Sequence, residues 1–184
     1  MKATMHPKTQ SFRYLLMTPL VAALASGCAP QGSMPASPPE ASEKLPQPAP
    51  PLHGTLIDGG SFDLAARDGQ VTVIDFWAVW CEPCRRTLPF VAKLHAQNLE
   101  GVNVIAVSVD DSAQVIAPFL SDLGLSLPVL HDHGGAIAQA WAPPAMPTAY
   151  VVGPHGKIQF ELLGEETNHE SLLNAKVKQA LQGS

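Results

Sequence analysis

Residues 71–84 read VTVIDFWAVWCEPC, an apolar run that leads into two cysteines separated by two residues. The part over 71–77 is rich in β-branched and aromatic residues, which is typical of a central strand buried on both faces. A helix is expected to follow over 83–98, because proline in the first helical turn loses no hydrogen bond. The sequence therefore places Cys81 and Cys84 where a buried strand passes into a helix.

This spacing of two cysteines at a helix start has chemical consequences. The two sulfurs can reach bonding distance. Cys81 is expected at the helix N-terminus, where the macrodipole and the free N–H groups stabilise a thiolate, the species that attacks disulfides. Cys84, one turn further on, would then resolve the mixed disulfide. The pattern indicates a redox-active pair that needs no bound cofactor, because the dithiol itself carries two electrons.

Other uses of two such cysteines require further residues or leave open alternatives. A structural zinc site needs a second pair of ligands, and the one further cysteine is Cys28, so no metal is expected. A c-type haem site needs a histidine directly after the second cysteine, where Arg85 stands. A structural disulfide across so short a loop constrains the unfolded chain little. Transport of Cu(I) between thiolates is the alternative from another functional class, and thiol peroxidase chemistry is a weaker one.

Charged residues surround the cysteine pair. Asp75 lies inside the apolar strand, where burial would raise its pKa and allow it to exchange a proton with Cys84. A hydrogen-bonded acid at the strand edge is the other reading of Asp75. Arg85 and Arg86 in the first helical turn would stabilise a Cys81 thiolate, whereas Glu82 would oppose it, and the net sign stays open.

From residue 52 onward the hydrophobic pattern alternates between strand and helix periods. Such alternation requires parallel pairing in the middle of the sheet, while the closing hairpin is antiparallel. The fold class is therefore α/β, with a central mixed sheet flanked by helices, an N-terminal hairpin and an inserted helix–strand segment. The expected elements are hairpins over 53–64 and 149–162, further strands over 71–77, 102–109 and 127–130, and helices over 83–98, 112–123, 136–141 and 167–181.

The N-terminal part has a different composition. A basic start without acids, an apolar stretch over 14–24 and small residues before Cys28 predict a secretory signal over 1–27. It resembles a bacterial lipoprotein signal, in which the cysteine is lipidated. Residues 28–51 are rich in proline, alanine and serine and are expected to form a disordered tether. The folded domain is then 52–184, anchored to a bacterial membrane through Cys28 and facing the periplasm or the cell exterior.

Charge and hydropathy exclude some partners. The net charge of −5 argues against nucleic acid, which needs basic clusters. No stretch of 18 apolar residues exists, so no ordinary transmembrane helix is indicated.

The run over 73–84, with Pro89 in the following helix and Met146-Pro147-Thr148 further on, resembles the thioredoxin superfamily. The segment between the strands at 102–109 and 127–130 is similar to the TlpA/ResA branch of that superfamily. The resemblance implies a thioredoxin-like fold over 52–184. It also implies Cys81 as nucleophile, Cys84 as resolving thiol and Pro147 as a cis-proline facing them.

The same resemblance implies further site residues. The backbone of Met146 would pair with the substrate in β-fashion, and Trp80, Glu82 and Pro83 would line the substrate contact. The Glu-Pro dipeptide is found in the cytochrome c maturation reductases of the branch, which also carry a second acid near the site. Asp111 is the nearest match to that acid. The branch usually has asparagine at the position of Asp75, so this chain departs from it there.

We therefore expect an exported, lipid-anchored, monomeric thiol-disulfide oxidoreductase that reduces disulfide-bonded protein substrates. An integral-membrane thiol protein would supply its electrons. A disulfide oxidase or isomerase is the alternative within the same chemistry.

Overall fold

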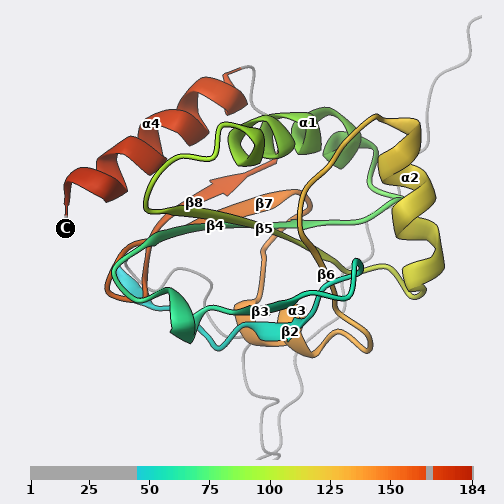
Figure 1. Ribbon diagram of the computed structural model, residues 1–184, viewed down its shortest axis with the longest axis horizontal. Coiled ribbons are helices and arrows are strands. Elements are labelled where there is room, and N and C mark those ends of the chain that lie inside the picture. Colours follow the sequence, from blue (N-terminus) through green and yellow to red (C-terminus); the bar gives the residue numbers. More distant parts are fainter. Residues whose placement is uncertain (1–44, 165–167, 184) are drawn as a thin grey trace, which may run out of the picture. The chain divides into compact units, whose positions relative to one another are not determined.

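The computed structural model describes residues 45–164 and 168–183. These residues form one six-stranded sheet of strand order β1-β8-β7-β4-β5-β6 and one two-stranded sheet, β2-β3 (Figure 1). The strands are β1 (Gln47–Pro48), β2 (His53–Thr55), β3 (Ser61–Asp63), β4 (Val71–Trp77), β5 (Val102–Ser108), β6 (Val129–His131), β7 (Thr148–Val152) and β8 (Lys157–Leu163). The helices are α1 (Glu82–Ala96), α2 (Ile116–Asp122), α3 (Ala136–Trp141) and α4 (His169–Gln182), with short 3-10 turns η1 (Ala65–Arg67) and η2 (Ala113–Val115).

Strand β4 lies at the centre of the large sheet. It pairs in parallel with β5 and antiparallel with β7, so the sheet is mixed, as the sequence predicts. All seven residues of β4 are buried, which explains why its sequence is a continuous apolar run rather than an alternating one.

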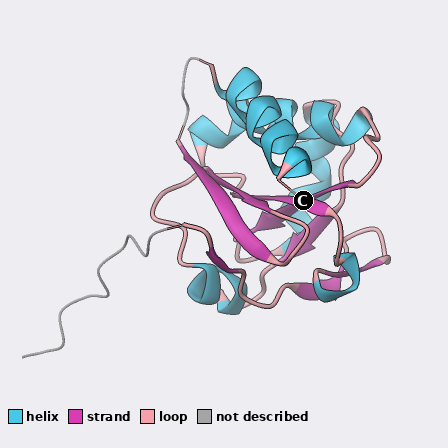
Figure 2. Cartoon of the chain, turned by 90° about the vertical axis from the view of Figure 1, so that its left-hand side faces the viewer, coloured by secondary structure: helices cyan, strands magenta, loops and turns pink. Residues whose placement is uncertain are grey.

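Two hydrophobic cores lie on the two faces of this sheet. One face is covered by α1, α2 and α4, and the other by α3 and the small β2-β3 sheet (Figures 1 and 2). Because successive side chains of a strand point to opposite faces, Trp77 belongs to the first core and Phe76 to the second. Phe76 packs edge-on against Tyr150, with ring centroids 5.9 Å apart.

The described fold begins before residue 52. Strand β1 lies within the segment expected to be tether, and it pairs with the start of β8, Gln47 opposite Ile158 and Pro48 opposite Lys157. The following residues cross the second face, where the backbone N–H of Leu64 donates to the carbonyl of Leu52 at 2.9 Å. The sequence did not predict this strand, because proline donates no ladder hydrogen bond and a proline-rich segment is therefore not expected to form a strand.

Some expectations concern residues that the structure does not describe. The signal over 1–27 and Cys28 lie outside the described residues. So does Thr167, the first residue of the expected helix over 167–181, and α4 begins at His169. Among residues 45–164 and 168–183, no helix is both long and apolar enough to cross a membrane.

We expect Leu52→Ala to destabilise the protein by about 2–5 kcal/mol, because Leu52 is a fully buried side chain of the second core. Urea unfolding of the whole chain measures the change. Ile57→Ala is the matched control at an exposed apolar position, with an expected change within about 0.5 kcal/mol. A loss for Leu52→Ala as small as the one expected for Ile57→Ala would show that the segment before β2 contributes no core packing.

Candidate active site

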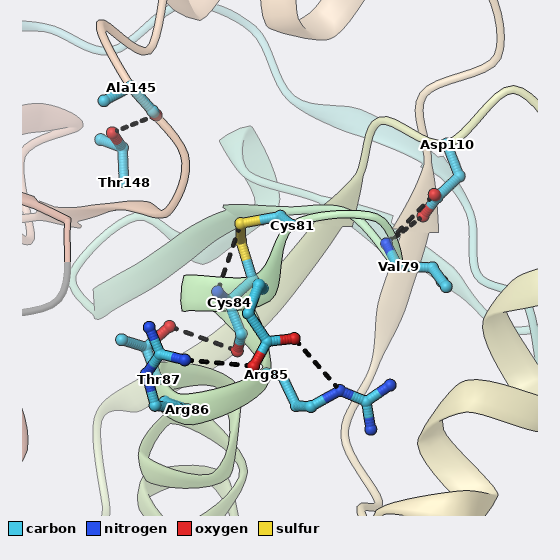
Figure 3. The surroundings of a disulfide bond; sticks show 10 residues. Val79, Cys81, Cys84, Arg85, Arg86, Thr87, Asp110, Ala145 and Thr148 are labelled. Carbon is cyan, nitrogen blue, oxygen red and sulfur yellow. Dashed lines mark hydrogen bonds and ion pairs between the residues drawn. A yellow bond between two sulfur atoms is a disulfide. The ribbon is translucent and has the colours of Figure 1, made fainter.

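Cys81 and Cys84 are joined by a disulfide at the start of α1, with an S–S distance of 2.03 Å (Figure 3). Cys81 is the N-cap residue of the helix, and its Sγ accepts a hydrogen bond from the backbone N–H of Cys84 at 3.2 Å. Cys81 is 5% exposed and Cys84 is 1% exposed, so an attacking thiol reaches Cys81 more readily. The roles of Cys81 as nucleophile and Cys84 as resolving thiol stay predictions, with which this order of exposure is compatible.

The residues flanking the disulfide differ in exposure. Trp80 is 68% exposed, whereas Trp77, three residues earlier, is fully buried in the first core. Glu82 is exposed and Pro83 is half-buried. Trp80 and Glu82 are therefore free to contact a substrate, whereas Trp77 serves packing.

The loop before β7 lies close to the end of β4, since Thr148 pairs with Phe76. The Met146–Pro147 peptide bond is cis, as the resemblance implies. Two hydrogen bonds fix this loop: the Thr148 hydroxyl donates to the carbonyl of Ala145 at 2.7 Å, and the N–H of Gly164 donates to the carbonyl of Pro147 at 2.8 Å. Figure 3 shows Ala145 and Thr148 across from the disulfide.

Asp75 is fully buried in β4. By strand alternation its side chain points to the same face as Val73 and Trp77, which is the face that packs against Cys84 and α1. Neither carboxyl oxygen has a hydrogen-bond partner among the described residues. Burial raises the pKa of Asp75 from 3.8 to about 8, so the group is mostly protonated at neutral pH.

A second acid contacts the loop before the disulfide, and it is Asp110 rather than Asp111. Both carboxylate oxygens of Asp110 accept from the backbone N–H of Val79 at 3.1 Å, and one also accepts from the Ser108 hydroxyl at 2.9 Å. Asp110 is buried, whereas Asp111 is exposed. Sequence reasoning missed Asp110 because the bond joins residues 31 positions apart, although its place directly after a buried strand was visible.

Two histidines at the end of β6 lie near Asp110, His131 as the last residue of the strand and His133 just after it. The ring Nε2 of His131 lies 2.7 Å from the backbone carbonyl of Asp110, and the rings of His131 and His133 are 5.8 Å apart. Within the described part of the chain, no three histidine, cysteine or acidic side chains are placed to hold a metal ion.

Comparisons with known proteins agree with this geometry. The sequence model of a family described as the AhpC/TSA family matches residues 45–161. Thiol-disulfide oxidoreductase ResA of Oceanobacillus iheyensis is 34% identical over 112 residues, which cover 60% of this chain and 58% of the relative. ResA of Bacillus thuringiensis subsp. konkukian is 28% identical over 132 residues, which cover 71% of this chain and 76% of the relative.

A solved structure gives the same result for the fold. A crystal structure of a candidate thiol:disulfide interchange protein DsbE from Chlorobium tepidum superimposes with a TM-score of 0.69 at 26% identity. The match covers 76% of this chain and 99% of that chain. The fold is thioredoxin-like, with a mixed central sheet flanked by helices, and the sequence prediction of the fold class is confirmed.

The buried acid makes stability depend on pH. Between pH 3.8 and about 8 the folded protein holds a proton on Asp75 that the unfolded chain has lost, so stability falls as pH rises through this window. At pH 7 we expect Asp75→Asn to raise the free energy of unfolding, measured with urea, by on the order of a few kcal/mol. Below pH 4 the variant and the parent protein should be equally stable. Asp111→Asn should leave the profile unchanged. Parallel profiles for the parent and Asp75→Asn would contradict the raised pKa.

The contact of Asp110 predicts a stability difference between adjacent acids. Asp110→Ala leaves the Val79 N–H and the Ser108 hydroxyl without their acceptor, so we expect a loss of about 1.5–3 kcal/mol in urea unfolding. Asp111→Ala should change the free energy of unfolding by less than about 0.5 kcal/mol. Equal free energies of unfolding for the two alanine variants would show that the hydrogen bonds of Asp110 do not contribute to stability.

Proposed function

The chain belongs to the AhpC/TSA family, and on that premise we propose that it is a thiol-disulfide oxidoreductase that reduces protein disulfides outside the cytoplasm. The observation that carries the proposal is the Cys81–Cys84 disulfide at the N-terminus of α1, with the more accessible sulfur at the helix cap. Relatives named thiol-disulfide oxidoreductase ResA support the same chemistry.

The reduced protein would act in two exchange steps. The Cys81 thiolate attacks one sulfur of a substrate disulfide; the Cys81–substrate bond forms, and the other substrate sulfur leaves as a thiolate that takes a proton from water. Cys84 then loses its proton to Asp75 in the fraction of molecules in which this carboxyl is ionised, which is the smaller fraction at neutral pH, and attacks the Cys81 sulfur. The Cys81–Cys84 disulfide forms, the second substrate sulfur is released, and two electrons have passed to the substrate.

Regeneration reverses these steps at the same groups. A donor thiolate attacks the Cys81 sulfur, the donor–Cys81 bond forms, and the Cys81–Cys84 bond breaks with Cys84 as the leaving thiolate. The second thiol of the donor then attacks the donor sulfur, which forms the donor disulfide and releases Cys81. The raised pKa of Asp75 allows it to return its proton to Cys84 at neutral pH, because the acid is then mostly protonated. One buried carboxyl thereby serves as acid in one half of the cycle and as base in the other.

The direction of electron flow and the location rest on the sequence. The Glu82-Pro83 dipeptide, similar to that of cytochrome c maturation reductases, favours reduction, and the substrate class that we propose is disulfide-bonded proteins. The N-terminal pattern favours export, lipidation of Cys28 and anchoring to a bacterial membrane. A reductase in an oxidising compartment needs an electron source, so an integral-membrane thiol protein is the proposed donor.

A redox titration of the whole chain in glutathione and dithiothreitol buffers at pH 7, read by thiol alkylation, tests the proposal. We expect a reversible two-electron transition with a midpoint near or below about −250 mV. Cys81→Ser should abolish disulfide reduction, because it removes the attacking sulfur. Cys84→Ser should accumulate a mixed disulfide, because it removes only the resolving thiol.

Other outcomes would change the conclusion. A midpoint near −120 to −180 mV would place the protein with disulfide oxidases and isomerases and reverse the proposed direction. Absence of any reversible transition would remove the oxidoreductase function and favour thiolate binding of Cu(I).

A further inference from the structure

Three charged side chains, Glu82, Arg85 and Arg86, lie at the start of α1, directly after Cys81. Figure 3 shows the Arg85 and Arg86 side chains extending from this part of the helix. Glu82 lies between two arginines: its Oε1 is 3.1 Å from a terminal nitrogen of Arg86, and its Oε2 is 3.9 Å from Nε of Arg85. Cations at a helix N-terminus are unfavourable to the helix dipole. Exposed ion pairs of this kind contribute only about 0–1 kcal/mol, so Glu82 alone restrains the arginines weakly.

Arg85 has a second contact that comes from another element. Its guanidinium carbon lies 4.7 Å from the centroid of the Phe119 ring, on α2. Phe119 in turn packs on Trp77, with ring centroids 5.4 Å apart and planes tilted by 31°. Trp77 is the last residue of β4, just before the loop that leads to Cys81. One continuous stack therefore links α1, α2 and β4 at the active site.

We infer that Arg85 is a positioning residue for the Cys81 thiolate and that Phe119 holds its guanidinium in place. The inference rests on the proposed function, because it concerns the reduced form of the same cysteine pair. It assigns a role to the segment between β5 and β6: by supplying Phe119, this segment holds a positive charge at the first turn of the helix that Cys81 caps.

The physical reason is restraint of a flexible side chain. A free arginine distributes its charge over many rotamers in water, where its field is screened. A face-on ring holds the guanidinium with about 0.5–1 kcal/mol at an exposed site. Held at the first turn of α1, the charge offsets the Glu82 carboxylate, and the thiolate of reduced Cys81 is more stable. A more stable thiolate makes the disulfide easier to reduce.

The test uses exchange with glutathione, in which the protein disulfide and two glutathione thiols give the protein dithiol and one glutathione disulfide. In Arg85→Gln the charge is lost. We expect the equilibrium constant for reduction to fall about threefold, and the rate of iodoacetamide alkylation of reduced Cys81 at pH 7 to fall by a similar factor.

Phe119→Leu separates position from charge, because Arg85 keeps its charge and loses only the ring beneath it. We expect a shift in the same direction, about twofold, in both measurements. The double variant Arg85→Gln/Phe119→Leu should shift no further than Arg85→Gln alone. Such non-additivity shows that Phe119 acts through Arg85.

Phe62→Leu is the matched control for lost packing. Phe62 is 6% exposed and Phe119 4% exposed, and each has an arginine over its ring, Arg67 at 5.6 Å in the case of Phe62. Phe62 belongs to the second core, away from the disulfide. We expect Phe62→Leu to lower stability comparably to Phe119→Leu and to leave the exchange constant and the alkylation rate unchanged.

The inference is overturned if Phe119→Leu behaves as the parent protein in both measurements, if its effect adds fully to that of Arg85→Gln, or if Phe62→Leu produces an equal shift. These failures are distinct from failure of the proposed function. In that case the parent protein itself would show no reversible exchange with glutathione.

Discussion

The structure depends on one junction, the point at which the buried strand β4 ends and α1 begins. Hydrogen bonding to β5 on one side and β7 on the other fixes the end of β4. Cys81 then becomes the N-cap of α1, and its sulfur accepts a hydrogen bond from the N–H of Cys84. The first N–H groups of a helix generally need such acceptors from outside the helical ladder. The same position favours a thiolate. Helix capping and the proposed activation of Cys81 as a nucleophile thus involve the same atom.

The neighbouring elements all restrain this junction from different sides. Asp110 at the end of β5 holds the loop through Val79. The cis-Pro147 loop is fixed by hydrogen bonds from Thr148 and Gly164. Asp75 acts differently, because a buried carboxyl without a hydrogen-bond partner weakens folding above its ordinary pKa. Groups whose pKa is strongly perturbed by burial are concentrated at active sites, and the proton transfer that we propose for Asp75 would make use of this one.

Patterns within a few consecutive residues predicted the elements whose formation depends on those residues alone. The β-branched run of β4, the proline at the start of α1 and the glycine-bounded hairpin of β7 and β8 each express their structure within a few residues. The contacts that complete the site do not. Asp110 with Val79 and Arg85 with Phe119 join separate segments, and neither periodicity nor spacing reports which side chains meet after folding. Strand β1 escaped prediction for a related reason, because its pairing comes from β8 and not from its own proline-rich sequence.

The direction of β8 relates the chain's entry point to its chemistry. Leu163, at the end of β8, pairs with Thr148, which follows the cis-proline. Lys157, at the start of β8, pairs with Pro48 of β1. At ~3.3 Å per residue, the strand separates these two ends by roughly 20 Å. The chain therefore enters the fold at the end of the sheet opposite the disulfide.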